Sequence, residues 1–207
     1  MTASPRRIIV GISGASGVIY GIRMLETLRR LEIETHLVMS RSGEVTMALE
    51  TGWKVADVRK LATVFHRIDD IGASISSGSF RTLGMVVAPC SMRSMSEIAH
   101  GITSSLLTRA ADVVLKERRR LVLMVRATPL HLGHLRTMTQ LAEMGAVIAP
   151  PVPAFYSRPA DIDDMVNHTV GRVLDLFDID TGTLRRWGEE GTRLSGRSAR
   201  FSEDEIR

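Results

Sequence analysis

The stretch Gly11-Ile12-Ser13-Gly14-Ala15-Ser16-Gly17 decides how this chain folds. It follows the apolar run Ile8-Ile9-Val10 and precedes a segment of helical periodicity that starts near Val18. A strand, a glycine turn and a helix start make an anion site, because the first N–H groups of a helix are unpaired and its dipole favours negative charge. We therefore predict a phosphate cradle here. The alternative is a glycine turn that only closes a β–α unit.

The glycine spacing in this loop differs from the dinucleotide fingerprint. That fingerprint is G-x-G-x-x-G, with an acidic residue at the end of the second strand that binds the ribose. Here the glycines stand at 11, 14 and 17, and the second apolar run ends in Met39-Ser40. Ser40 can hydrogen-bond a phosphate or a ring edge, but it cannot make a charged bidentate contact with a ribose. The pattern favours a mononucleotide such as FMN over NAD.

Apolar runs alternate with amphipathic segments along the rest of the chain. We expect strands at 7–12, 35–39, 84–88, 121–125 and 146–149, and helices at 16–31, 40–50, 56–62, 94–100, 106–116, 132–144 and 161–177. This alternation predicts an α/β fold, a three-layer Rossmann-like (flavodoxin-like) parallel sheet with helices on both faces. We expect one FMN-binding domain over residues 1–190 and a polar, flexible tail over 191–207.

Composition limits the class of protein. The chain has 207 residues, of which 44% are hydrophobic and 4% aromatic, so one domain with an aliphatic core is expected. No run of 18 apolar residues is present, and the first residues lack the apolar core of a signal peptide. Cys90 is the only cysteine, so no intrachain disulfide can form. These features predict a cytoplasmic protein without a membrane span.

The formal net charge is +4, and most of the positive charges are arginines. They are scattered, apart from Arg118-Arg119-Arg120 and the tail, and no basic stripe carries interleaved aromatic residues. Nucleic acid is therefore not an expected partner. The planar arginine fork also binds phosphate and carboxylate, so a few of these side chains can serve a small anionic ligand.

Polar groups gather where the expected strands end. Ligands of parallel sheets bind at the carboxyl ends of the strands. The residues at these ends are Gly14 to Ser16, Ser40, Ser91 with Ser94, Arg126, and the loop at Tyr156. Together they offer hydroxyl groups, backbone N–H groups and one guanidinium to a ligand. The alternative is that the serines only cap helices, and one residue can do both.

These residues together resemble the UbiX-like flavin prenyltransferases, a family that includes partner subunits of phenolic-acid decarboxylases. The resemblance runs from the first strand to about Gly188. Its marks are G-x-S-G-A-S-G at 11–17, M-S-R at 39–41, L-E-T at 49–51, S-S-G-S-F-R-T at 76–82, P-C-S-M at 89–92, R-A-A-D-V-x-L-K-E-R-R at 109–119, P-A-F-Y at 153–156 and R-W-G at 186–188.

The resemblance implies a metal-independent prenyltransferase. It would transfer a dimethylallyl group from dimethylallyl phosphate to N5 and C6 of reduced FMN, and deliver the prenylated FMN to a UbiD-type decarboxylase. It also implies a homo-oligomer, often a dodecamer, in which subunits share the active site.

The resemblance assigns residues to each part of this reaction. The catalytic candidates are Ser16, Glu50, Lys116 and Arg126. The FMN contacts are Gly14, Ala15, Ser16, Ser40, Ser91, Met92, Arg93, Ser94 and Arg126. The donor would contact Lys116, Tyr156, Arg172 and Trp187, because a phosphate held without a metal needs cationic and hydroxyl groups. Each has a structural alternative: Lys116 in a solvated charge run, Arg172 on a helix surface, Tyr156 and Trp187 in packing contacts.

Glu50 matches a glutamate near the flavin ring, and burial there would raise its pKa and let it act as an acid or a base. Two positions depart from the family pattern. Members commonly carry Arg-Glu where this chain has Arg126-Ala127, and Asp-Asn where it has Ser104-Ser105. An alanine cannot relay a proton. The alternative function is therefore an FMN or prenyl-FMN carrier, or partner subunit, with weak or no prenyl transfer.

Three further patterns carry little weight. His131 and His134 lack a third ligand in helical register, so a helix start is favoured over a metal site. Cys90 lacks a histidine partner and is expected to be a buried strand-end residue. A flavoprotein cysteine decarboxylase would require an early active-site histidine and a P-x-M-N-x-x-M-W-like run, and neither is found.

Overall fold

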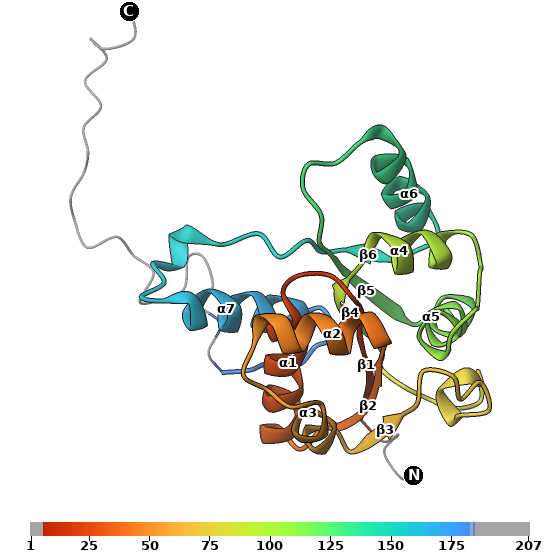
Figure 1. The fold of residues 1–207 in the computed structure, drawn as a ribbon, viewed down its shortest axis with the longest axis horizontal. Coiled ribbons are helices and arrows are strands. Elements are labelled where there is room, and N and C mark those ends of the chain that lie inside the picture. Colours follow the sequence, from red (N-terminus) through yellow and green to blue (C-terminus); the bar gives the residue numbers. More distant parts are fainter. Residues whose placement is uncertain (1–5, 183, 185–207) are drawn as a thin grey trace, which may run out of the picture.

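The computed structural model describes residues 6–182 and 184, which form a three-layer α/β structure (Figure 1). Its central sheet has the strand order β3-β2-β1-β4-β5-β6, and every paired strand is parallel. The strands are β1 (Arg7–Ile12), β2 (Glu34–Met39), β3 (Val64–His66), β4 (Gly84–Cys90), β5 (Arg120–Val125) and β6 (Val147–Ile148). The predicted fold class is confirmed.

Helices connect the strands and cover both faces of the sheet. They are α1 (Val18–Arg30), α2 (Arg41–Glu50), α3 (Val55–Leu61), α4 (Met92–Ala99), α5 (Leu106–Lys116), α6 (Leu132–Glu143) and α7 (Ile162–Asp175), with single 3-10 turns at η1 (Ser74–Ser76) and η2 (Phe155–Ser157). The helix predictions agree with these bounds to within about two residues at most ends, as expected for frayed termini.

Alternating strand residues divide the core into two layers. Ile8 and Val10 of β1 pack with buried residues of α1, α2, α3 and α7, whereas Ile9 packs with those of α4, α5 and α6. Successive side chains of a strand point to opposite faces, so a continuous apolar run such as Ile8-Ile9-Val10 is what a sheet covered on both faces requires.

The strand order reverses between β1 and β4. From β1 the chain first adds β2 and β3 on one side, then returns to add β4, β5 and β6 on the other. Ligands of open α/β sheets bind at such a switch point, outside the carboxyl ends of the strands. The Gly11–Gly17 stretch lies at this switch point, because it contains the carboxyl end of β1 and the loop that follows it.

Strand β3 was missed by the sequence reasoning, because three edge residues with one exposed end show no readable alternation. The predicted domain boundary near 190, the tail and Trp187 lie outside the described residues. Among the helices of the described part, none is long and apolar enough to cross a membrane.

Two glycines allow close packing around the switch point. A Cβ on Gly14 would overlap with the Cβ of Ser42, because the β1–α1 loop lies against the first turn of α2. A Cβ on Gly21 would overlap with the carbonyl oxygen of Ala88, so α1 lies close to β4. These close contacts hold the β1–α1 loop against the start of α2 and hold α1 against β4.

Candidate functional site

Four neighbouring strands present the predicted polar groups along one edge of the sheet. The β1–α1 loop lies between Ser40, after β2, and Ser91, after β4, while Arg126 follows β5. The backbone N–H of Ser40 donates to Ile12 O at 2.9 Å, and that of Arg126 donates to Cys90 O at 3.1 Å. Neighbouring strands lie about 4.8 Å apart, so this row spans about 14 Å.

The start of α1 binds the carboxylate of Glu50. Glu50 Oε2 accepts hydrogen bonds from the backbone N–H groups of Gly17, at 2.8 Å, and Val18, at 3.3 Å. Gly17 is the N-cap residue and has φ of 95°, the left-handed conformation that glycine adopts readily, and it brings no side chain to cap the helix. The prediction that these N–H groups are open to a phosphate is wrong for Gly17 and Val18, because α2 ends beside them and supplies an anion.

The expected rise in the pKa of Glu50 is also wrong. Partial burial raises the pKa, but hydrogen bonds from the Ser16 side chain and from the N–H groups of Gly17 and Val18, together with the charge of Arg126, outweigh it. The pKa of Glu50 therefore lies below its usual range. The side chain is ionised at neutral pH and can accept a proton rather than donate one.

A cavity of about 570 Å³ opens beside this helix start. Its lining residues are Ser16, Gly17, Ile19, Tyr20, Glu50, Thr51, Val125, Arg126, Ala127, Thr128, Pro150, Pro151, Val152, Ile162 and Val166. It therefore brings together three of the four catalytic candidates, Ser16, Glu50 and Arg126. Among the described lining residues, Glu50 is the one acidic side chain and Arg126 the one basic side chain.

Tyr20 was missed by the sequence reasoning. It lies in the first turn of α1, four residues after Ser16, which precedes the helix, so its place at the predicted helix start was the signal that could have found it. Burial raises the pKa of the Tyr20 phenol, which keeps it protonated and able to donate a hydrogen bond into the cavity.

The predicted serines cap helices. The hydroxyl of Ser40 accepts a hydrogen bond from Gly43 N at 3.0 Å, and that of Ser91 accepts one from Ser94 N at 3.2 Å. Capping uses one lone pair of a hydroxyl oxygen and leaves other hydrogen-bonding capacity. The structural alternative is therefore true of both residues, and a ligand contact stays a prediction.

Ser13 joins two of the strand ends. Its buried hydroxyl donates to Pro89 O at 2.9 Å and accepts from Ser91 N at 2.7 Å. The sequence showed this hydroxyl in the glycine loop but did not indicate its partners. Ser13 holds the start of α4 against the β1–α1 loop.

Two residues of the first turn of α4 complete the predicted FMN set. Met92 is partly buried and packs against the core. The Arg93 side chain is 82% exposed and pairs with Glu97 at 2.8 Å, so it lies along its own helix. A contact between the Arg93 side chain and FMN stays a prediction.

The predicted donor-binding residues do not share the cavity. Lys116 ends α5, before the start of β5, whereas Arg126 follows the end of β5, so a strand of about 20 Å separates them. Arg172 is exposed and pairs with Asp175 at 2.7 Å, about 9 Å along α7 from Val166 at the cavity. Tyr156 lies in η2 and packs its ring on His168, with centroids 5.6 Å apart. Trp187 lies outside the described residues.

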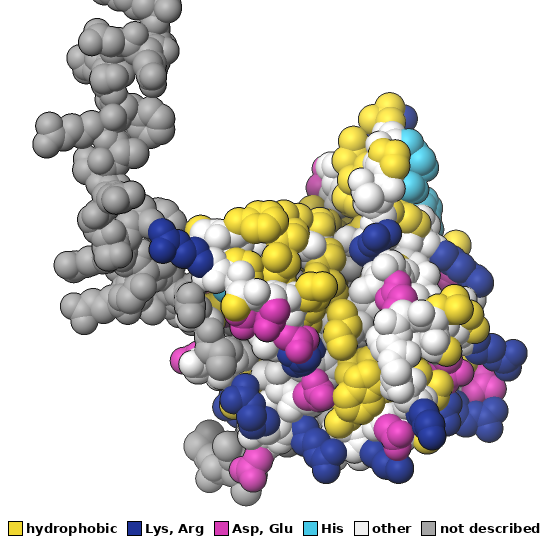
Figure 2. All heavy atoms as spheres, turned by 60° about the vertical axis from the view of Figure 1, so that its left-hand side comes forward, with side chains coloured by type: hydrophobic (Ala, Val, Ile, Leu, Met, Phe, Trp, Pro, Cys, Tyr) yellow, Lys and Arg dark blue, Asp and Glu magenta, His cyan; other side chains and the backbone are white. Residues whose placement is uncertain are grey.

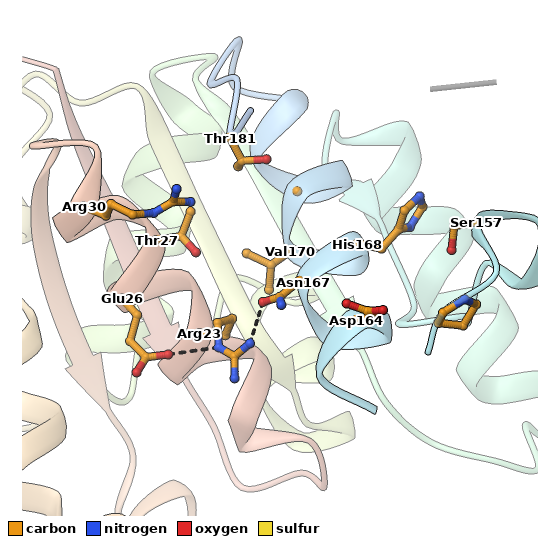
Figure 3. A pocket seen from close by; sticks show the side chains of 12 residues that line it. Arg23, Glu26, Thr27, Arg30, Ser157, Asp164, Asn167, His168, Val170 and Thr181 are labelled. Atoms are coloured by element: carbon orange, nitrogen blue, oxygen red, sulfur yellow. Dashed lines mark hydrogen bonds and ion pairs between the residues drawn. The ribbon is translucent and has the colours of Figure 1, made fainter. Parts of the chain in front are cut away.

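A second cavity, of about 450 Å³, lies between α1 and α7. Figure 3 shows Arg23 of α1 directed at Asn167 of α7, with His168 and Ser157 farther along the cavity. Arg23 is also paired with Glu26 and Asp163, each at 2.9 Å, so its charge is neutralised. None of the predicted site residues within the described part lines this cavity. We therefore place the candidate site at the strand ends.

Apolar side chains surround the mouth of the candidate site. The four most exposed large apolar residues of the described part are Leu49 (82%), Ile162 (77%), Val152 (72%) and Phe155 (70%). Val152 and Ile162 line the cavity, and Leu49 precedes Glu50. Figure 2, which brings the α7 side forward, shows hydrophobic side chains gathered on this face. An exposed apolar surface of this kind is typical of an interaction site.

The patterns given little weight in the sequence have structural roles. The predicted helix start at His131 is confirmed, since His131 Nδ1 accepts a hydrogen bond from His134 N at 3.3 Å and caps α6. Within the described ranges, no group of three or more His, Cys, Asp or Glu is placed to hold a metal ion. Cys90 is buried, which raises its thiol pKa to about 12, so it is not a nucleophile at neutral pH.

Comparisons with known proteins show the family of this chain. The Flavoprotein family model matches residues 2–174. The chain is 65% identical over 175 residues to the curated flavin prenyltransferase UbiX of Escherichia coli K12, covering 84% of this chain and 93% of that protein.

Solved structures show the same similarity. AnUbiX (PadA1), in complex with FMN and dimethylallyl pyrophosphate, superposes with a TM-score of 0.88 at 52% identity, covering 90% of this chain and 99% of that one. A dodecameric FMN-dependent UbiX-like decarboxylase from Escherichia coli O157:H7 has a TM-score of 0.86 at 48% identity, covering 88% and 100%.

Proposed function

We propose a reaction for this chain, which belongs to the Flavoprotein family and is a UbiX-like flavin prenyltransferase. It transfers a dimethylallyl group from dimethylallyl phosphate to reduced FMN. The observation that carries the proposal is the cavity at the strand ends, where Ser16, Glu50 and Arg126 face one volume. Its volume of about 570 Å³ lies within the range of small-molecule sites.

The residues of the cavity fit the groups that the reaction requires. Reduced FMN supplies N5 and C6, to which the prenyl carbons become bonded. Arg126 provides a permanent positive charge for the phosphate, which takes the electron pair of the breaking C–O bond as it leaves. Tyr20 provides a hydroxyl donor beside it, whereas the Ser16 hydroxyl donates to Glu50. Ring closure would bond C6 to one carbon of the prenyl double bond, while the other carbon gains a proton equivalent to the one that N5 releases. Glu50, held ionised by the helix start, can accept the proton that C6 loses.

We infer that the working unit is a homo-oligomer in which neighbouring copies complete each site. Lys116 lies at the far edge of the sheet from Arg126, so it can reach a prenyl phosphate only in another copy. We propose the same for Arg172. The exposed apolar residues at the mouth of the cavity and the dodecameric relative support this arrangement.

Two further parts of the proposal concern the setting of the reaction. We propose that the prenylated FMN passes to a UbiD-type decarboxylase, as the family resemblance implies. We also propose a cytoplasmic location, which the lone, buried Cys90 fits because a reducing compartment suits an unpaired thiol.

A second candidate function rests on Ala127. This residue lines the cavity beside Arg126 and offers no group for proton transfer. The candidate is an FMN or prenyl-FMN carrier, or a partner subunit, with weak or no prenyl transfer. Replacing Ala127→Glu would then create activity that the parent protein lacks, whereas an active parent excludes a pure carrier.

The deciding experiment is a single-turnover assay without oxygen. Purified protein is mixed with reduced FMN and dimethylallyl phosphate. The flavin is then released, and its mass is measured by mass spectrometry. We expect a flavin whose mass has increased by C5H8, because the dimethylallyl group replaces one hydrogen. Retention of unmodified FMN with every short prenyl phosphate would favour the carrier, and loss of FMN binding altogether would exclude both.

A further inference from the structure

An arginine clamps the segment Ser77 to Phe80, here named the 77–80 loop, which precedes β4. Arg119 Nη1 donates to Phe80 O and Nη2 donates to Gly78 O, each at 2.7 Å. The Arg119 side chain is 18% exposed, so this fork is largely shielded from water. Two parallel hydrogen bonds from one planar group fix both distance and direction.

Gly78 makes room for an ion pair beside this clamp. Lys116 Nζ donates a hydrogen bond to Glu117 Oε1, and the other carboxylate oxygen of Glu117 lies 3.8 Å from Arg119 Nη2. A Cβ on Gly78 would overlap with Glu117 Oε1 and would come within 2.8 Å of Lys116 Nζ. The Lys116–Glu117 pair therefore occupies the space that any other side chain at position 78 would fill.

The loop is also held through the side chain of Phe80. The Arg7 guanidinium lies 4.6 Å from the centroid of the Phe80 ring, and His36 meets the ring edge-on with centroids 4.8 Å apart. The loop is thus anchored through its backbone by α5–β5 and through its ring by β1 and β2. The loop beside the Lys116–Glu117 pair is therefore held at both its backbone and its ring.

We propose that Gly78, Glu117 and Arg119 are positioning residues that hold the Lys116 ammonium where the phosphate of the prenyl donor binds in a neighbouring copy. This inference rests on the proposed function. A lysine side chain has a flexible four-carbon stem, and ordering it on binding costs entropy. A clamp that orders the side chain in advance lowers this cost and strengthens binding of the phosphate.

The test measures donor affinity in the complete FMN-loaded assembly by calorimetry with dimethylallyl phosphate. Arg119→Lys keeps the positive charge but loses the fork, so we expect about tenfold weaker donor binding. Gly78→Ala displaces the ion pair and should weaken donor binding similarly. The control is Gly72→Ala, since a Cβ there meets nothing closer than 3.5 Å.

Two readouts separate positioning from a structural role. FMN affinity and oligomer mass should stay unchanged in Arg119→Lys, although loss of the shielded fork lowers the melting temperature. In a Lys116→Ala background, neither Arg119→Lys nor Gly78→Ala should weaken donor binding further, because the group that they position is gone.

Several outcomes would overturn the inference. One is normal donor affinity in Arg119→Lys where Lys116→Ala binds the donor weakly. Others are an unchanged affinity in Lys116→Ala, parallel losses of donor and FMN affinity in both variants, or no donor binding by the parent. The mass-spectrometric assay judges the proposed prenyl transfer separately, so the two failures can be told apart.

Discussion

Glu50 carries the negative charge that the start of α1 attracts. The interaction joins residues 33 positions apart, between the end of one helix and the start of another. Its consequence is chemical as well as structural, because the same contacts keep the carboxylate ionised beside Arg126. Glu50, which we propose accepts a proton, thus also caps the start of α1 beside the cavity.

Replacing Glu50→Gln should lower stability at neutral pH by about 0.5–1 kcal/mol, since a charge at a helix N-terminus is lost. The pKa of Glu50 is lower in the folded chain than its ordinary value of 4.5, so its contribution is present above that value and is lost as pH falls through the folded pKa. Denaturant unfolding at pH 7 and at successively lower pH measures the difference.

Glu44→Gln is the matched control, because Glu44 lies on the same helix but does not line the cavity. Its carboxylate pairs with Arg59, with 2.8 Å between Glu44 Oε1 and Arg59 Nη2. We expect Glu50→Gln, and not Glu44→Gln, to slow prenyl transfer. A stability difference at Glu50 that does not shrink in acid would contradict the assigned pKa.

Gly14→Ala should disrupt the β1–α1 loop. The added Cβ overlaps with Ser42, so the loop or the first turn of α2 must move. We expect a loss of about 1–3 kcal/mol in unfolding free energy and weaker FMN binding, measured by denaturation and by flavin fluorescence. Gly52→Ala is the control, because a Cβ there meets nothing within 4 Å. Equal effects at the two positions would disprove the packing argument.

Serine-capped helices frame the candidate site. Ser40 starts α2 directly after β2 and Ser91 starts α4 directly after β4, whereas Ser105 starts α5 beside Ile68, whose carbonyl accepts a hydrogen bond from Leu106 N. The three hydroxyl groups perform the same backbone task. Only the first two are predicted to contact FMN, so substitutions at these helix starts can separate capping from recognition.

Ser91→Ala and Ser105→Ala should each cost about 1 kcal/mol of stability through a lost cap. Only Ser91→Ala should also weaken FMN binding. Unfolding free energies and FMN dissociation constants for the two variants provide the comparison. If FMN affinity is unchanged in Ser91→Ala, this serine is a cap alone.

The whole subunit presents its cavity beside an apolar surface and keeps Lys116 on the opposite edge of the sheet. In the proposed homo-oligomer, one copy offers two different parts of a shared site at two places. Closed assemblies satisfy such a surface by repeating one contact under symmetry. In that proposed assembly, we expect the exposed residues at the cavity mouth of one copy to meet the Lys116 end of the sheet in the next.

Val152→Asp should reduce the assembly to smaller species, because it places a charge on an apolar interface. Val64→Asp is the matched control, since Val64 is partly exposed on the edge strand β3. Sedimentation velocity or mass photometry gives the size of each variant. An intact assembly in Val152→Asp would mean that this surface faces solvent.

Local patterns were enough to predict the parallel α/β fold and the row of polar groups at the strand ends. Apolar periodicity, the glycine turn and the capping serines each depend on residues a few positions apart, so a reader of the chain can find them. The carboxylate at the start of α1, the placement of Lys116 away from Arg126, and the strand β3 were different. They depend on which segments pack together across tens of residues, and only the folded chain sets those distances and the pKa that follows from them.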